Sequence, residues 1–281
     1  MIAVTHLPAL TASVRSLAVR QGGRVAASIE TFGGVAAMTA ETAKYTVLDL
    51  VTGQFPWKEF FAQAWFITSV TLIPTLLVAI PFGVTISVQV GSLAQQVGAT
   101  SFMGAATGLA AIREASPMVT ALLLAGAAGS AICADLGART VREEVDALQV
   151  MALRPVRVLV VPRVTACMVV GFFLVGVVAF TAITTGYLFN VLAQNGTAGS
   201  YVESFAAFAQ APDLVLALVK AVVFSFIAAT VASYKGLQAT GGPKGVGQAV
   251  NASVVLSVVL LFIANLVITQ VYATYVPQRV L

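Results

Sequence analysis

Residues 156–189 read VRVLVVPRVTACMVVGFFLVGVVAFTAITTGYLF, and this stretch decides the class of fold. After Arg163 no charged residue follows until Glu203, so the run exceeds the roughly 20 apolar residues that cross a bilayer as a helix. Across the chain 59% of the residues are hydrophobic and 9% are charged, whereas soluble domains average about 25% charged residues. This composition excludes an ordinary soluble fold and predicts an integral membrane protein.

Four further stretches share this apolar character. We therefore predict five membrane-spanning helices: Trp65–Val90, Ser101–Cys133, Val156–Phe189, Leu214–Ser233 and Val250–Tyr272. The predicted fold class is an all-α integral membrane protein with a membrane core over residues 65–272. Because the sequence shows no internal repeat and no low-complexity tract, we expect residues 1–281 to form a single domain.

Basic residues are distributed unevenly between the connections. Those after the second and fourth spans are rich in Lys and Arg, whereas the connection Asn190–Asp213 contains neither. By the positive-inside rule the basic connections are cytoplasmic, which places the N-terminus inside and the C-terminus outside. Arg279, near the C-terminus, is an exception to the rule.

The remaining composition narrows the kinds of partner. The formal net charge is +4, and the basic residues are scattered rather than clustered, which argues against a nucleic-acid partner. Cys133 and Cys167 lack the spacing of a metal site or of a disulfide framework. We therefore predict no metal ligands and no catalytic residues.

The N-terminal region, residues 1–55, differs from the spans. Between Val14 and Val51 charges interrupt the apolar pattern too often for a membrane crossing. Apolar residues nevertheless recur at roughly helical spacing, namely Ile29, Phe32, Met38, Tyr45 and Leu48. This pattern predicts amphipathic helices in the plane of the membrane interface. A soluble amphipathic helix packed against another part of the protein is the alternative.

The segment after the second span, residues 134–151, reads ADLGARTVREEVDALQVM. Thr140 and Glu143 have the spacing of a capping box, which predicts a short helix over residues 140–151. On such a helix Val141, Val145 and Leu148 share one face, and the other face carries exposed charges. The pattern is typical of a docking element for a cytoplasmic partner, although a polar connector between two spans would also fit.

Part of this segment resembles a known family. The run EEVDALQVM at 143–151, followed by Pro155 and by LVVPR at 159–163, resembles the coupling-helix signature of the MlaE/YrbE permeases. Upstream, REASPMVTAL at 113–122 and AGAAGSA at 125–131 are similar to that family's second span, with Ala127 where many relatives have Arg. The resemblance implies an N-terminal interfacial helix, five membrane helices and a cytoplasmic coupling helix.

The resemblance also implies partners and a substrate class. Two permeases of this family form the membrane core of an ABC transporter for lipids in the bacterial inner membrane. A dimeric cytoplasmic ATPase hydrolyses ATP, so the permease is not an enzyme and binds no cofactor itself, and extracytoplasmic Mce-domain proteins complete the complex. The Ala- and Val-rich sequence resembles the actinobacterial YrbE branch, which implies a second, different YrbE-type chain and import; an identical partner remains open. The substrate class is a fatty or mycolic acid, a sterol or a phospholipid.

Two groups of candidate functional residues follow from these observations. By resemblance, the ATPase-coupling residues are Arg142, Glu143, Glu144, Asp146, Leu148 and Met151. A charge at the centre of a membrane helix costs roughly 2.5–3.5 kcal/mol, so Arg113, Glu114 and Lys220 are expected to face protein or a watery cavity. The resemblance adds Asp213 to this second group.

The spacing of the second group predicts its geometry. Neighbouring helical residues point about 100° apart, so Arg113 and Glu114 are expected to reach different partners. Asp213 and Lys220 are two turns apart on one helical face. The family carries similar charges beside its lipid cavity, so we expect these residues to line that cavity or its gate. Interhelical ion pairs that only fix the packing are the alternative.

Other functions stay open at this point. A secondary transporter driven by an ion gradient could use Arg113, Glu114 and Lys220 as a relay, but the inverted repeat typical of that class is missing. A membrane-embedded lipid-modifying enzyme would need a cluster of His, Cys or metal ligands beside the carboxylates. The glycine-rich segment 241–247 lacks the order of a phosphate-binding loop. An ABC permease is therefore the leading hypothesis.

Overall fold

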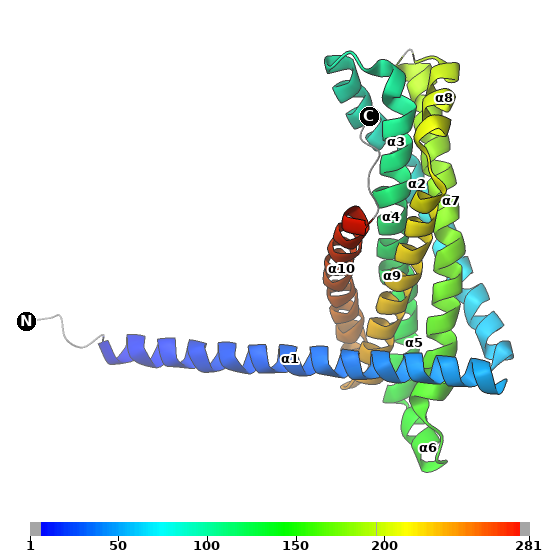
Figure 1. The fold of residues 1–281 in the computed structure, drawn as a ribbon. Helices are drawn as coiled ribbons and strands as arrows, with labels where there is room; N and C mark the ends of the chain where they lie inside the picture. The colour runs from blue at the N-terminus through cyan, green and yellow to red at the C-terminus, as the bar shows by residue number, and fades with distance from the viewer. Residues whose placement is uncertain (1–6, 195, 276–281) are drawn as a thin grey trace, which may run out of the picture.

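The computed structural model describes residues 7–194 and 196–275, with side chains from Glu30 onward. Within these residues every regular element is a helix. Figure 1 shows long helices standing side by side as a bundle, and one further long helix lying across one end of it. The predicted all-α membrane fold is confirmed.

Five segments of the described chain are long and apolar enough to cross a membrane. They are α2 (Trp57–Gln96), the composite segment Thr100–Val141, the composite segment Val156–Ala193, α9 (Ala211–Leu237) and α10 (Gly242–Tyr275). Each contains one predicted span and extends beyond it at both ends, except that the third begins at Val156 as predicted. The helices are longer than predicted because the backbone stays helical where polar residues replace the apolar run.

The second span is not a uniform α-helix. Its segments are η1 (Thr100–Phe102), α3 (Met103–Ala110), the π-helical η2 (Ala111–Ala115), α4 (Ser116–Leu123), the π-helical η3 (Leu124–Ala128) and α5 (Gly129–Val141). Pro117 explains the first π-helical turn, because proline has no N–H to donate to the carbonyl of Arg113 four residues earlier. The Ser116 hydroxyl donates to the Ala111 carbonyl at 2.7 Å, so the wider turn keeps that oxygen bonded.

The predicted coupling segment forms a short helix, but not at the predicted start. Helix α5 continues to Val141, and the Thr140 hydroxyl donates to the Leu136 carbonyl at 2.9 Å instead of capping a new helix. Helix α6 covers Glu144–Val150 and follows Glu143, whose φ of 60° is left-handed. The predicted capping box is therefore wrong. The π-helical η4 (Val156–Val160) and α7 (Val161–Ala193) then form the third span.

Close helix contacts hold together the half of the bundle that lies away from α6. Gly83 of α2 faces the backbone of Ala182 in α7 with no room for a Cβ atom, and Ser87 donates to the Gly186 carbonyl at 3.1 Å. The connection predicted as an outer loop contains the helix α8 (Ala198–Phe208). Gly104 and Gly108 of α3 face α8 so closely that a Cβ atom at either position would overlap it.

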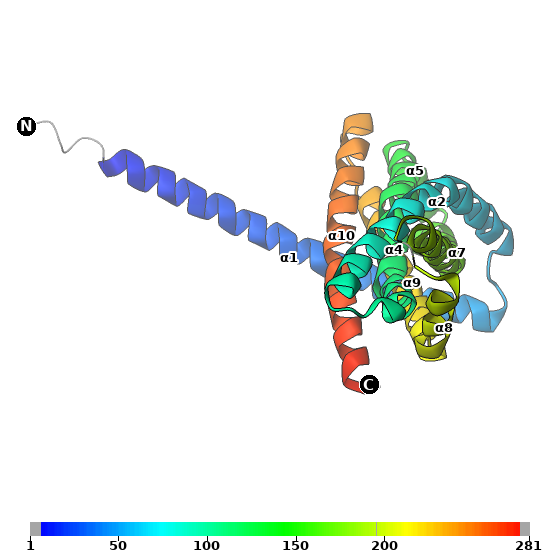
Figure 2. The same cartoon turned by 90° about the horizontal axis from the view of Figure 1, so that it is seen from above.

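The N-terminal helix α1 (Leu7–Thr52) lies across the end of the bundle from which α6 projects (Figure 1). Seen along the bundle, it extends far beyond the other helices (Figure 2). Tyr45 is buried against the bundle, and Met38 packs there as well. Phe32 and Leu48 are exposed.

Candidate functional site

The four charged residues of the predicted cavity group form two separate ion pairs. Arg113 Nε lies 2.7 Å from Asp213 Oδ1, and Lys220 Nζ lies 2.8 Å from Glu114 Oε1. Both pairs join the π-helical segment η2 to α9. Arg113 and Glu114 thus reach different partners, as their angular separation on the helix predicted.

Lys220 makes a further contact that depends on the proline in the second span. Lys220 Nζ donates to the Arg113 carbonyl at 3.0 Å, and this is the oxygen that Pro117 leaves without its usual helical partner. The ammonium group is fully buried and therefore depends on these two acceptors. The local break in the helix supplies part of the binding site for a buried cation.

Helix α10 completes both pairs with polar side chains. Asn265 Nδ2 donates to Glu114 Oε2 at 3.1 Å, and the Thr269 hydroxyl donates to Glu114 Oε1 at 3.2 Å. The Tyr272 hydroxyl donates to Asp213 Oδ1 at 3.1 Å. These contacts were not predicted. Asn265, Thr269 and Tyr272 nevertheless have the i, i+4 and i+7 spacing of one face of an otherwise apolar helix, and that spacing could have indicated a polar contact.

A small cavity of about 220 Å³ lies beside these pairs. Arg113 and Glu114 line it, together with Leu216 of α9 and with Thr269 and Tyr272 of α10. Asp213 and Lys220 do not line it, because they are buried behind their partners. The geometry places two of the four predicted residues where a bound molecule could touch them and gives the other two supporting positions.

The second candidate region is the hairpin formed by α6 and its flanking turns. Arg142 Nε lies 2.8 Å from Glu144 Oε1 on its exposed surface. Val145 is buried, and Leu148 packs partly inward, so one face of α6 is attached to the bundle. Val150 and Met151 are 88% and 61% exposed. The exposed predicted coupling residues are Arg142, Glu143, Glu144, Asp146 and Met151, whereas Leu148 faces the protein.

The base of this hairpin contains a buried arginine. Arg163 Nη2 lies 2.6 Å from Asp135 Oδ2, and its Nη1 donates to the Leu159 carbonyl at 2.6 Å. Asp135 also accepts from Arg139 Nε at 3.2 Å. The pair ties the end of α5 to the beginning of α7, which are the two stems of the hairpin.

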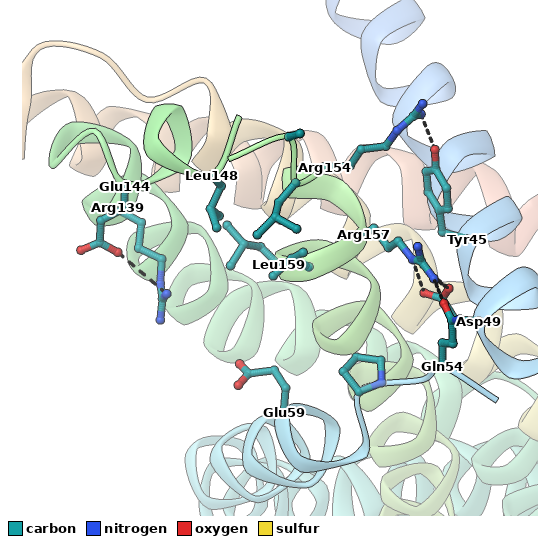
Figure 3. Close-up of a pocket in the computed structure, with 14 residues that line it drawn as sticks. Tyr45, Asp49, Gln54, Glu59, Arg139, Glu144, Leu148, Arg154, Arg157 and Leu159 are labelled. Carbon is teal, nitrogen blue, oxygen red and sulfur yellow. Dashed lines mark hydrogen bonds and ion pairs between the residues drawn. The ribbon is translucent and has the colours of Figure 1, made fainter. Parts of the chain in front are cut away.

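Between α1 and the hairpin lies a cleft of about 850 Å³ (Figure 3). Polar side chains from α1, the start of α2 and the hairpin line it, with Leu148 and Leu159 on its wall. Asp49 and Arg157 form an ion pair at one side of the cleft, and Tyr45 accepts a hydrogen bond from Arg154 (Figure 3).

Comparison with known proteins identifies the family. Residues 60–271 match the family described as Permease MlaE. The chain belongs to the MlaE permease family. The matched residues include the five spans almost completely, the α6 hairpin and both intramembrane ion pairs, so the two candidate regions lie inside the MlaE fold.

Several curated proteins are similar to this MlaE chain. A probable ABC transporter permease of Synechocystis is 36% identical over 185 residues, which cover 65% of this chain and 70% of the relative. A probable ABC transporter permease of Rickettsia typhi is 35% identical over 162 residues, 58% of this chain and 62% of the relative. The chloroplastic protein TRIGALACTOSYLDIACYLGLYCEROL 1 of Arabidopsis thaliana is 30% identical over 235 residues, 82% of this chain and 66% of the relative. The chain thus spans a little less than two thirds of the last two.

Proposed function

We propose that the chain is the transmembrane permease subunit of an ABC transporter that imports hydrophobic lipids across the bacterial inner membrane. Family membership and the printed names of the Synechocystis and Rickettsia relatives support the transporter class. The Arabidopsis relative is named after a galactolipid, which agrees with a lipid substrate. A fatty or mycolic acid, a sterol or a phospholipid would belong to the same class.

The observation that carries this proposal is the shape and chemistry of the α6 hairpin. The hairpin projects from the end of the bundle where α1 lies (Figure 1). It exposes carboxylates beside the apolar side chains of Val150 and Met151. Exposed apolar residues on a projecting helix support contact with a protein partner. We assign that partner as a dimeric cytoplasmic ABC ATPase, which hydrolyses ATP while this chain binds no cofactor.

The rest of the proposed complex follows from the same assignment. A second YrbE-type permease, of different sequence, pairs with this chain, and Mce-domain proteins bind at the outer end. The end with α1 and α6 is cytoplasmic, and the C-terminus is outside. The cavity lined by Arg113 and Glu114 contacts the lipid headgroup or gates its passage, with Asp213 and Lys220 holding those two side chains in place.

The proposal is tested by purifying the tagged chain from its native membrane, identifying its partners by mass spectrometry and measuring ATP hydrolysis. Asp146→Lys reverses an exposed charge on α6, and Glu203→Lys makes the same change on the exposed surface of α8 as a control. We expect an ABC ATPase with the wild type and with Glu203→Lys, and its loss with Asp146→Lys. A stable chain that lacks an ATPase and transports in liposomes under an ion gradient would instead identify a secondary transporter.

A further inference from the structure

The interfacial helix α1 is joined to the coupling hairpin by a buried carboxylate. Asp49 of α1 has a side chain only 1% exposed, and its Oδ1 accepts from Arg157 Nη2 at 2.6 Å and Nε at 2.9 Å. The same Nη2 donates to Gln54 Oε1 at 3.0 Å, just after the end of α1. A guanidinium group that uses two nitrogens on one carboxylate fixes direction as well as distance. The pair therefore fixes the end of α1 against η4.

A second contact lies one helical turn earlier on the same face of α1. Tyr45, four residues before Asp49, is buried and accepts a hydrogen bond from Arg154 Nη1. The Arg154 guanidinium also lies 5.7 Å from the centre of the Tyr45 ring. Arg154 and Arg157 flank the turn between α6 and the third span, so both contacts act on the C-terminal stem of the hairpin.

Apolar packing connects the same elements. One buried cluster contains Tyr45 of α1, Phe55 of the turn between α1 and α2, Phe60 of α2, Val145 of α6 and Leu159 of η4. Close-packed interiors deform little and transmit displacement between the elements that share them. The coupling helix and the end of α1 thus belong to one packed unit, although the cleft in Figure 3 separates their exposed surfaces.

Nearer to its middle, α1 meets the helices that hold the intramembrane ion pairs. Val35 is buried against Val231 and Tyr234 of α9, and Leu256 and Leu260 of α10 pack against the same cluster. Gly34 faces the Tyr234 ring with no room for a Cβ atom. From Val35 to Asp49 an α-helix rises about 21 Å, so α1 spans the distance between the coupling hairpin and the α9–α10 pair.

We propose that α1 rigidly connects the α6 hairpin to α9 and α10 during the transport cycle, with Asp49 and Arg157 as its positioning residues. A displacement of α6 by the ATPase moves η4, and through the Asp49–Arg157 pair it moves α1. Helix α1 then carries the displacement to α9 and α10, which bear Lys220 and the polar stripe around Glu114. This inference rests on the proposed function only for the source of the displacement; the rigid connection between α1 and α6 is a property of this chain.

The connection is tested by pulsed electron paramagnetic resonance between spin labels at Val47→Cys on α1 and Val150→Cys on α6, both exposed positions. The two native cysteines, both buried, are replaced by Ala. Asp49→Asn removes the negative charge of the pair, whereas Arg157→Lys keeps the positive charge but loses the bidentate hydrogen bonding. Lys44→Gln removes an exposed charge from the same helix and is the control.

We expect a narrow distance distribution in the wild type and in Lys44→Gln that stays the same when the assembled complex is trapped with ATP and vanadate. Asp49→Asn is expected to broaden the distribution in the purified permease alone, and Arg157→Lys to broaden it less. A wild-type distance that shifts on trapping, or variants with the wild-type distribution, would overturn the inference. If Asp49→Asn does not fold, Arg157→Lys decides. Absence of an ATPase from the wild type would contradict the proposed function but would leave the measurement on the permease alone decisive for this inference.

Discussion

Lys220 Nζ lies 2.8 Å from Glu114 Oε1, and the two partners differ sharply in their surroundings. The Lys220 side chain is fully buried, whereas the Glu114 side chain is 45% exposed at the wall of the small cavity. Neutralising the exposed partner leaves a buried cation without its counter-charge. Neutralising the buried partner leaves a carboxylate that still has Asn265 and Thr269 and an open side.

This asymmetry predicts unequal effects of two substitutions. Glu114→Gln is expected to destabilise the protein by about 3 kcal/mol, because the unpaired Lys220 charge stays buried. Lys220→Met is expected to cost less, because the remaining Glu114 carboxylate borders the cavity and keeps its hydrogen bonds from Asn265 and Thr269. The double variant should resemble Lys220→Met. Unfolding of the purified protein in detergent measures all three, and additive losses would show that the two side chains do not depend on each other.

The contact between α3 and α8 gives a second prediction. Gly104→Ala places a methyl group against the Tyr201 carbonyl, which belongs to the backbone and can move only with α8. We expect a loss of about 1–3 kcal/mol from this overpacking. Gly126→Ala, in the same span, meets nothing within 4 Å and serves as the control. Equal unfolding midpoints for the two variants would contradict the close contact.

The base of the α6 hairpin gives a third prediction, again from unequal burial. Arg163 is 1% exposed and Asp135 is 39% exposed. Asp135→Asn leaves a buried guanidinium without its counter-charge and should cost about 3 kcal/mol or more. Arg163→Met leaves Asp135 paired with Arg139 and should cost less. Thermal unfolding followed by tryptophan fluorescence compares the stability of the two variants. A larger loss for Arg163→Met than for Asp135→Asn would rule out this account of the pair.

The proposed orientation is tested by labelling single cysteines in a background without Cys133 and Cys167. Val150→Cys marks the α6 hairpin, and Gly199→Cys marks the exposed start of α8. A membrane-impermeant maleimide applied to intact spheroplasts should label position 199, and it should reach position 150 only after permeabilisation. The opposite pattern would invert the topology and remove the cytoplasmic assignment of α6.

The spans could be predicted because each is a long apolar run, and length with composition is enough to identify a membrane helix. The angular spacing on the helix also predicted that Arg113 and Glu114 reach different partners. Which partner each one reaches could not be predicted, because the pairing with Asp213 and Lys220 depends on how α9 packs against the second span. The sequence did hold one unused signal: Pro117 frees the carbonyl of Arg113, which then accepts a hydrogen bond from Lys220.

Other features depended on competition between local patterns. The capping box at Thr140 and Glu143 was a valid local pattern, but α5 continues through Thr140, whose hydroxyl bonds within that helix, and Glu143 takes a left-handed turn. Helix α8 is short, and its position depends on the glycine face of α3. Asp49 was not recognised because a carboxylate on the packed side of α1 is explained only by Arg157, far away in the sequence.

The central claim is that an ABC ATPase binds the α6 hairpin. A photo-crosslinking amino acid placed at Met151, on the exposed tip, tests it in intact cells, and the same residue at Leu77, on the exposed apolar face of α2, is the control. We predict that position 151 forms a covalent adduct with an ATP-binding protein identified by mass spectrometry and that position 77 does not. No such adduct at position 151, in cells where the chain is folded and inserted, would contradict the claim.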